Sequence, residues 1–134
     1  MKYWRFIPAI IILGVIWYLS DQPGLKSDYT PIQDFFLRKG AHIVEYLILY
    51  LALFWGFIQK KFSKLSINEF NYINVQVFIV SFIATVLDEW HQTWIPGREG
   101  KPLDIAFDSI GFLLAYIILW AFWTTFTESR KIKR

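Results

Sequence analysis

Residues 88–98 have the sequence DEWHQTWIPGR and separate two long apolar runs, residues 72–87 and 105–126. Each run is close to the roughly 20 residues that a helix needs to cross the hydrocarbon core of a bilayer. The stretch between them holds carboxylates, an imidazole, a carboxamide and a guanidinium, and Pro96-Gly97 turns the chain. Ionisable groups at the end of a membrane segment indicate a functional site. The stretch therefore predicts two membrane helices joined by a turn, with a polar site beside it.

The overall composition places the whole chain in a membrane. Of its 134 residues, 55% are hydrophobic and 20% are aromatic, which is more apolar surface than a soluble domain of this size can bury. The absence of cysteine excludes disulfides, thiolate metal sites and cysteine nucleophiles. His42 and His91 are then the only soft nitrogen ligands or near-neutral bases. Because the basic residues occupy short flanks between apolar runs, the lipid bilayer is the expected partner and nucleic acid is not.

Four apolar runs predict the fold class, an all-α membrane protein that forms a four-transmembrane-helix bundle in a single domain, residues 1–134. The spans are expected at approximately residues 3–19, 41–58, 72–87 and 105–126. A cleaved signal peptide is the alternative interpretation of the first run, since Lys2 and Arg5 give it a basic start. Because WYLS at residues 17–20 lacks the small-x-small cleavage pattern, we expect a retained helix.

The polar segment before the second run predicts a further, shorter helix. Thr30-Pro31-Ile32-Gln33 fits a capping box with proline at the first helical position. We expect a short interfacial helix near residues 31–38, which lies on the membrane surface before the chain turns inward near Gly40.

The basic residues predict how the bundle is oriented. Four spans leave both termini on one side, and the side with more lysine and arginine is normally cytoplasmic. With cytoplasmic termini, the inner flanks hold Lys2, Arg5, Lys60, Lys61, Lys64, Arg130, Lys131, Lys133 and Arg134. The outer flanks hold Lys26, Arg38, Lys39, Arg98 and Lys101. We therefore expect a multi-pass protein of the cell membrane, with both termini in the cytoplasm and the turn at residues 88–98 outside.

The second run carries polar residues at helical spacing. One stripe of a helix is made of Lys39, His42, Tyr46, Leu49 and Leu53, and Glu45 borders it. At a rise of about 1.5 Å per residue, Glu45 lies roughly 7 Å inside a helix that starts at Gly40. A carboxylate at that depth is costly when it faces lipid, so we expect it to face the bundle or a wet cavity.

The third and fourth runs also present polar inner faces. Spacings of four, three and four residues predict one continuous polar face made of Ser81, Thr85, Asp88 and Gln92. Asp104 is expected to be the N-cap of the fourth helix. The inner face of that helix is expected to hold Asp108, Gly111 and Ala115. Its small residues allow a neighbouring helix to approach closely.

Three motifs together carry a resemblance to a known family. They are Lys39-Gly40-Ala41-His42-Ile43-Val44-Glu45-Tyr46, Asp88-Glu89-x-His91-Gln92 followed by Pro96-Gly97-Arg98, and Asp104-x-x-x-Asp108-x-x-Gly111. In this order, and over roughly residues 5–125, they resemble the VanZ-like family of small membrane proteins. The resemblance implies low-level resistance to glycopeptide antibiotics, teicoplanin above all, by a mechanism independent of remodelling the peptidoglycan terminus. It implies an architecture more than a chemistry.

These patterns predict a set of site residues. The expected binding residues are Lys39, His42, Glu45, Tyr46, Asp88, Glu89, His91, Gln92, Arg98, Asp104 and Asp108. The candidates for catalysis or metal binding are His42, Glu45, Asp88 and His91. His42 and Glu45 can form half of a metal site or a buried hydrogen-bonded pair. Asp88 and His91 can form an acid–base pair in which the carboxylate orients the imidazole.

Buried charges need partners, so the charged members of this set are expected to meet. The expected connected cluster consists of His42, Glu45, Asp88, His91, Arg98 and Asp108. Arg98 can clamp Asp88, Asp104 or Asp108, or its fork can hold a phosphate or carboxylate. No serine is clearly placed as a nucleophile, although Ser109 follows Asp108.

Two functions are compatible with this pattern. In the first, an outward-facing polar cluster binds an amphiphilic or anionic ligand of the cell envelope, such as a lipoglycopeptide or a lipid-linked cell-wall precursor. In the second, the protein is an intramembrane enzyme that depends on a metal or on histidine and carboxylates and acts on a lipid-linked phosphate, ester or amide. We favour binding because the chain offers no clear nucleophile. The pattern leaves open whether the protein catalyses a reaction and which cofactor it uses.

Overall fold

A computed structural model describes residues 2–22, 30–98 and 100–132 of the chain. The described residues form the helices η1 (Tyr3–Phe6), α1 (Ile7–Ser20), α2 (Pro31–Phe57), η2 (Phe62–Lys64), α3 (Ile67–Gln92) and α4 (Pro102–Ile132). They contain no strand. The segment made of η1 and α1, and each of α2, α3 and α4, is long and apolar enough to cross a membrane. The predicted all-α, four-span architecture is confirmed, and the chain is a multi-pass membrane protein.

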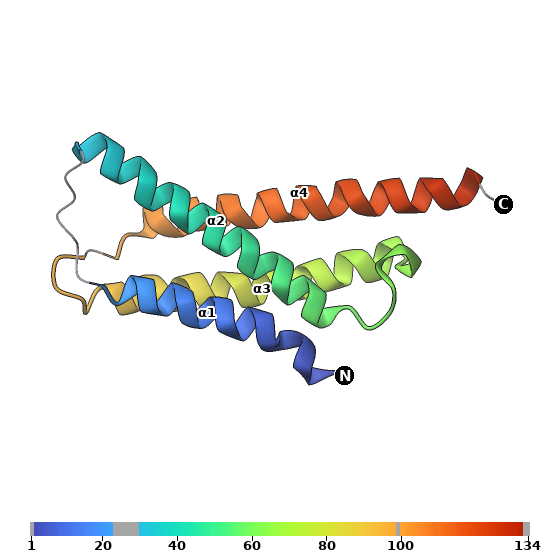
Figure 1. The fold of residues 1–134 in the computed structure, drawn as a ribbon, viewed down its shortest axis with the longest axis horizontal. Helices are drawn as coiled ribbons and strands as arrows, with labels where there is room; N and C mark the ends of the chain where they lie inside the picture. The colour runs from blue at the N-terminus through green and yellow to red at the C-terminus, as the bar shows by residue number, and fades with distance from the viewer. Residues whose placement is uncertain (1, 23–29, 99, 133–134) are drawn as a thin grey trace.

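The four long helices run alternately in opposite directions (Figure 1). The ends of α1 and α3 and the starts of α2 and α4 lie together at one end of the bundle, on the left of the view. We call this end, which contains Ser20, Gln92 and Pro102, the polar end. The start of α1 and the connection from α2 to α3 lie at the opposite end. Both α2 and α3 contact all three other long helices, and the most extensive contact in the bundle joins α2 to α4.

The start of α2 corrects one prediction. The capping box forms as expected, since the Thr30 hydroxyl accepts a hydrogen bond from the Gln33 amide and the Gln33 side chain accepts one from the Thr30 amide. The helix then continues through Gly40 to Phe57, so the separate interfacial helix expected near residues 31–38 is the first part of α2. A glycine costs a helix only about 1 kcal/mol. A break inside lipid would cost more, because it leaves backbone groups without hydrogen bonds.

Two other helices begin earlier than the apolar runs indicated. The helix α3 begins at Ile67 rather than at residue 72, because Ser66 and Glu69 form a second capping box. The helix α4 begins at Pro102, and proline suits the first helical position. Asp104 therefore lies in the first turn of α4 and is not its N-cap, which corrects that prediction.

Side chains of α2 fill the centre of the bundle. The stripe expected on this helix is buried from Tyr46 onward, with exposed fractions of 0% for Tyr46 and 1% for Leu49, whereas Lys39 and His42 are partly exposed. Gly111 of α4 lies against the α2 backbone, because a Cβ at this position would overlap the carbonyl oxygen of Ile43 and lie 2.9 Å from the amide nitrogen of Leu47. The predicted close helix approach is confirmed. Many large apolar side chains remain exposed on the outside of the bundle, as a lipid-facing surface requires.

Candidate functional site

The polar face predicted for α3 is buried inside the bundle. Ser81, Thr85 and Asp88 have no exposed surface, and Gln92 is 4% exposed. Glu89, which follows Asp88 on the helix, is also only 4% exposed. Two adjacent carboxylates therefore lie inside the polar end, where each oxygen needs a partner to offset the loss of water.

One oxygen of Asp88 is held firmly and the other is not. Its Oδ2 atom accepts hydrogen bonds from the Ser20 hydroxyl at 3.0 Å and from Gln92 Nε2 at 3.1 Å. Its buried Oδ1 atom has no hydrogen-bond partner among the described residues. Ser20 was not among the predicted site residues, and its only sequence signal is its position after the first apolar run. These bonds join the end of α1 to α3.

Glu89 follows the same pattern towards α4. Its Oε2 atom accepts a hydrogen bond from the backbone amide of Lys101 at 3.0 Å, while its buried Oε1 atom has no partner among the described residues. The chain reaches this position because Gly100 packs against the backbone of α3, where a Cβ would overlap the carbonyl oxygen of Glu89. Glu89 thereby fixes the start of α4 and keeps one oxygen directed into the bundle.

Asp108 of α4 is fully buried and lies between α2 and α3. Its Oδ2 atom accepts a hydrogen bond from the Thr85 hydroxyl. Its Oδ1 atom lies 3.3 Å from His42 Nδ1, but the two atoms are poorly aligned for a hydrogen bond. The imidazole and the carboxylate are therefore in contact without a hydrogen bond, and they form an ion pair when His42 is protonated.

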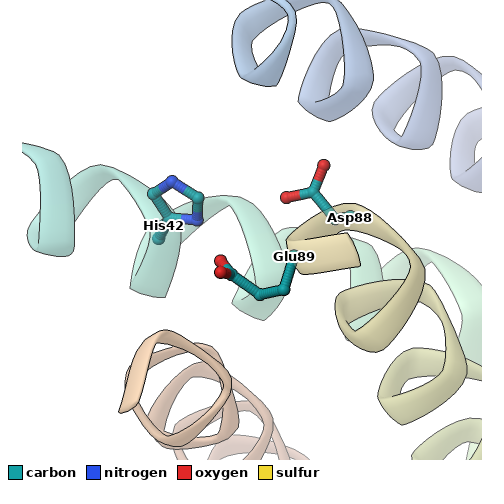
Figure 2. Close-up of side chains that lie close together, drawn as sticks. All are labelled: His42, Asp88 and Glu89. Atoms are coloured by element: carbon teal, nitrogen blue, oxygen red, sulfur yellow. The ribbon is translucent and has the colours of Figure 1, made fainter. Parts of the chain in front are cut away.

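Three side chains of the polar end converge on one point. Figure 2 shows the His42 ring of α2 and the Asp88 and Glu89 carboxylates of α3 directed towards the same space. Each offers a potential metal-ligating atom, and these atoms lie within 4.8 Å of one another. Of the four predicted metal candidates, His42 and Asp88 belong to this group. Glu45 and His91 do not, and Glu89 takes part instead.

His91 faces α1 rather than the centre of the bundle. Its ring stacks on Trp17 with centroids 5.0 Å apart, and its Nε2 atom lies 3.8 Å from Asp21 Oδ1. Asp88 and His91 therefore do not form the acid–base pair that their spacing permits. The two residues are three apart on α3, but α1 packs closely enough to bind the imidazole on its own side.

Arg98 also contacts α1. Its guanidinium donates hydrogen bonds to the carbonyl oxygens of Gln22 at 2.8 Å and Leu19 at 2.9 Å. Burial, followed by the nearby charge of Arg38, lowers the pKa of Arg98 from its ordinary value. Arg98 therefore holds the end of α1 rather than an aspartate, because carbonyl oxygens at a helix C-terminus carry partial negative charge and accept well from a cation. The predicted cluster of six residues is thus divided, with Arg98 and His91 on the α1 side.

The remaining predicted residues lie around this group. Lys39 forms an ion pair with Asp104 at 2.6 Å, which joins α2 to the first turn of α4. Glu45 is half-buried on α2. Tyr46 is fully buried, with its ring centroid 6.4 Å from that of His42. We call the set of His42, Glu45, Asp88, Glu89 and Asp108 the polar cluster.

Ser109 is not placed as a nucleophile. Its hydroxyl donates a hydrogen bond to the carbonyl oxygen of Ile105, one turn earlier in α4, at 2.7 Å. A serine nucleophile needs its hydroxyl bonded to a general base. The structure therefore gives Ser109 a local role in its own helix.

Comparison with known proteins identifies the family of the chain. A family model described as VanZ/LLP1 matches residues 5–124. No curated protein and no solved structure matched the chain. The matched region contains every residue of the polar cluster. It also contains the second and third membrane-spanning segments in full, the first from residue 5 and the fourth up to residue 124. The chain therefore belongs to the VanZ/LLP1 family.

Proposed function

We propose that this protein binds an amphiphilic ligand of the cell envelope at its polar end, and that this binding contributes to tolerance of glycopeptide antibiotics such as teicoplanin. The observation that carries the proposal is the set of buried carboxylates. Asp88 and Asp108 have no exposed surface and Glu89 has 4%, yet each keeps an oxygen without a hydrogen-bond partner among the described residues. Ionisable groups are costly in a membrane and are normally kept there for function.

The charge of the polar cluster selects the part of the ligand that binds there. Four carboxylates lie close enough to one imidazole to interact with its charge, so the cluster attracts a cation and repels a free anion. The favoured ligand therefore carries an amine or another cationic group on its head. An anionic head group requires a bridging cation.

A groove in the membrane-spanning part suits the tail of such a ligand. It has a volume of about 470 Å³ and lies between α3 and α4, beside Tyr50 of α2. Its lining includes Phe78 and Leu113, and it reaches Ser109, the neighbour of Asp108. Pockets of about 300 to 1,000 Å³ with mostly apolar walls are typical of small-molecule sites. A head group at the polar cluster and a tail along this groove account for both features.

The orientation completes the proposal. The greater number of basic flanking residues at the opposite end of the bundle supports cytoplasmic termini in the cell membrane. The polar end then faces the cell exterior, where envelope precursors and glycopeptides meet the membrane.

Growth in teicoplanin tests the role of the polar cluster. A strain that lacks the protein is complemented with wild type, Asp88→Asn, Asp108→Asn or Glu45→Gln, which keep shape and remove charge. Glu128→Gln, at an exposed position of α4, is the matched control. We expect the three cluster variants to lose the protection while membrane abundance stays normal. Wild-type protection in all three would contradict the proposal.

A matched pair of substitutions tests whether the groove binds the tail of the ligand. Leu113→Trp fills the groove, whereas Leu114→Trp adds the same bulk at the next residue, which does not line it. We expect Leu113→Trp alone to weaken binding of a fluorescent lipoglycopeptide to the purified protein in lipid nanodiscs. Equal effects of the two substitutions would contradict a tail-binding groove.

The contact between His42 and Asp108 favours a second candidate function. A carboxylate 3.3 Å from an imidazole is an arrangement that general acid–base catalysis uses. An intramembrane enzyme would convert a lipid-linked phosphate, ester or amide into a product of different mass. Mass spectrometry of such lipids after incubation with the purified protein decides between the two, because a binding protein leaves their masses unchanged.

A further inference from the structure

We propose that His42, Asp88 and Glu89 bind a divalent transition-metal ion, and that Asp108 orients His42 for this role. The three side chains come from two packed helices and place one potential ligand atom each within 4.8 Å of the others. Figure 2 shows both carboxylates directed towards the imidazole. This inference does not depend on the proposed function, since metal binding is measured without any organic ligand.

The way in which the carboxylates are anchored supports a metal site. Asp88 is held through Oδ2 by Ser20 and Gln92, and Glu89 is held through Oε2 by the backbone amide of Lys101. In each case the second oxygen is buried and has no hydrogen-bond partner among the described residues. Metal-ligating carboxylates are usually fixed in this way, with one oxygen bound by the protein and the other offered to the ion.

Asp108 completes the arrangement around the imidazole. The Thr85 hydroxyl holds its Oδ2 atom, and its Oδ1 atom faces His42 Nδ1 at 3.3 Å. A carboxylate beside a metal-bound histidine fixes the ring and raises its basicity. Asp108 therefore acts as a positioning residue or, after a small movement, as a further oxygen ligand.

The charge balance of the site points the same way. Asp88 and Asp108 have no exposed surface and Glu89 is 4% exposed, so water offers little stabilisation to any of the three. Uncompensated burial of several carboxylates is strongly unfavourable. Lys39 on α2 is already paired with Asp104, and the guanidinium of Arg98, whose charge acts on Asp88 and Glu89 from the turn, is hydrogen-bonded to the end of α1. A divalent ion supplies the missing positive charge at the point on which the free oxygens converge.

The ligand types indicate which ions fit. One imidazole nitrogen with two carboxylate oxygens suits zinc or manganese, whereas calcium and magnesium prefer oxygen ligands alone. Three protein ligands leave at least one coordination position for water or for a group of a bound molecule. An anionic head group could use this position, which would extend the range of ligands of the polar end.

Metal analysis of the purified full-length protein tests the proposal. Protein in mild detergent is stripped with EDTA, incubated with zinc chloride or manganese chloride, desalted and measured by mass spectrometry for metal content. We expect wild type to retain one ion per chain. Asp88→Asn, Glu89→Gln and His42→Gln should lose it, and Asp108→Asn should weaken binding about 10- to 100-fold, as substitutions beside a metal-bound histidine do.

Two controls separate this site from incidental binding. His91→Gln removes the other histidine of the chain, which faces Trp17 and Asp21, and should retain the ion. Glu128→Gln removes an exposed carboxylate and should also retain it. Equal loss from His91→Gln and His42→Gln would show surface binding and overturn the proposal.

A second measurement keeps the test decisive when a variant fails to fold. The thermal midpoint of the wild-type protein should rise with zinc relative to EDTA, and cobalt should give visible absorption bands of a nitrogen- and oxygen-bound ion. A wild-type protein with no metal, no thermal shift and no cobalt spectrum would show that the carboxylates are satisfied by protons or water, and the proposal would fail.

Discussion

Arg98 positions an entire turn with one side chain. The turn that follows α3 is closed by a hydrogen bond from the Arg98 amide to the Ile95 carbonyl oxygen at 3.1 Å, and Gly97 within it adopts a positive φ of 78°. The guanidinium ties this turn to the carbonyls of Leu19 and Gln22 at the end of α1. The same turn leads to Lys101, whose amide holds Glu89, so Arg98 indirectly supports the polar cluster.

We predict that Arg98→Ala destabilises the protein by about 1 to 2 kcal/mol, the lower part of the range for hydrogen bonds to charged groups, because the side chain is only half-buried. Arg98→Lys keeps the charge but lacks the forked donors of the guanidinium, so the free energy of unfolding should fall by about half as much. The measurement is the free energy of unfolding in detergent with increasing SDS. Wild-type stability of Arg98→Lys would show that the fork geometry is unimportant and would contradict the prediction.

Spacing along single helices was enough to predict some site residues. His42, Asp88 and Asp108 lie on inward stripes, and the structure brings them together. The same spacing could not predict the direction of His91, because that depends on how closely α1 packs against α3. Nor could it identify Glu89 as a potential metal ligand. Adjacent helical residues point about 100° apart, so both Asp88 and Glu89 can be buried only where neighbours lie on two sides.

At the scale of elements, the bundle depends on one close crossing. Gly111 brings α4 against the α2 backbone at Ile43 and Leu47, the residues that directly follow His42 and Tyr46. The crossing places Asp108, one turn before Gly111, beside His42. Any side chain at Gly111 therefore separates the two helices that supply the imidazole and its carboxylate.

We predict that Gly111→Ala costs about 1 to 3 kcal/mol, as overpacking normally does. The matched control is Gly40→Ala in α2, where nothing lies within 4 Å of the added methyl group. That change should be neutral or stabilise the protein by about 0.5 to 1 kcal/mol, because alanine is the better helix former. Thermal midpoints in detergent measure both. A loss at Gly40 would contradict the continuous helix over Pro31–Phe57.

Helix starts were partly readable from the sequence, but helix continuity was not. The Thr30 capping box correctly predicted the first turn of α2. The Ser66 capping box and Pro102 carried equally clear start signals that the apolar runs obscured. Gly40 suggested a break, although a lone glycine does not end a helix whose neighbours continue the hydrogen-bond pattern inside a bundle.

At the scale of the whole molecule, the two ends of the bundle have opposite character. The polar end contains the buried carboxylates. At the opposite end the Arg5 guanidinium donates a hydrogen bond to the carbonyl oxygen of Ile58, and Lys60 pairs with Glu69 at 2.6 Å. Basic side chains of this second end also line a hollow of about 420 Å³ with Trp4. This asymmetry is the structural counterpart of the charge bias along the chain.

We predict that the basic end faces the cytoplasm. The chain has no cysteine, so single cysteines can be introduced without removing others. Ser27→Cys should react with an impermeant maleimide in intact cells, and Lys61→Cys should react only after permeabilisation, because positive flanks remain inside. Labelling in the reverse pattern would show the opposite orientation, with the polar end in the cytoplasm.

The shallow position of the polar cluster also determines how strongly the membrane voltage acts on it. Asp88 lies one turn before the end of α3 at Gln92, about 6 Å along the helix axis. With Gln92 at the edge of a hydrocarbon core about 30 Å thick, an ion at Asp88 crosses only about a fifth of the electric field. A full crossing is worth about 2.3 kcal/mol per charge at 100 mV. The affinity for a divalent ion therefore changes about fivefold when a potential of 100 mV is lost, so energised and de-energised cells differ in metal occupancy only when the free ion is near its dissociation constant.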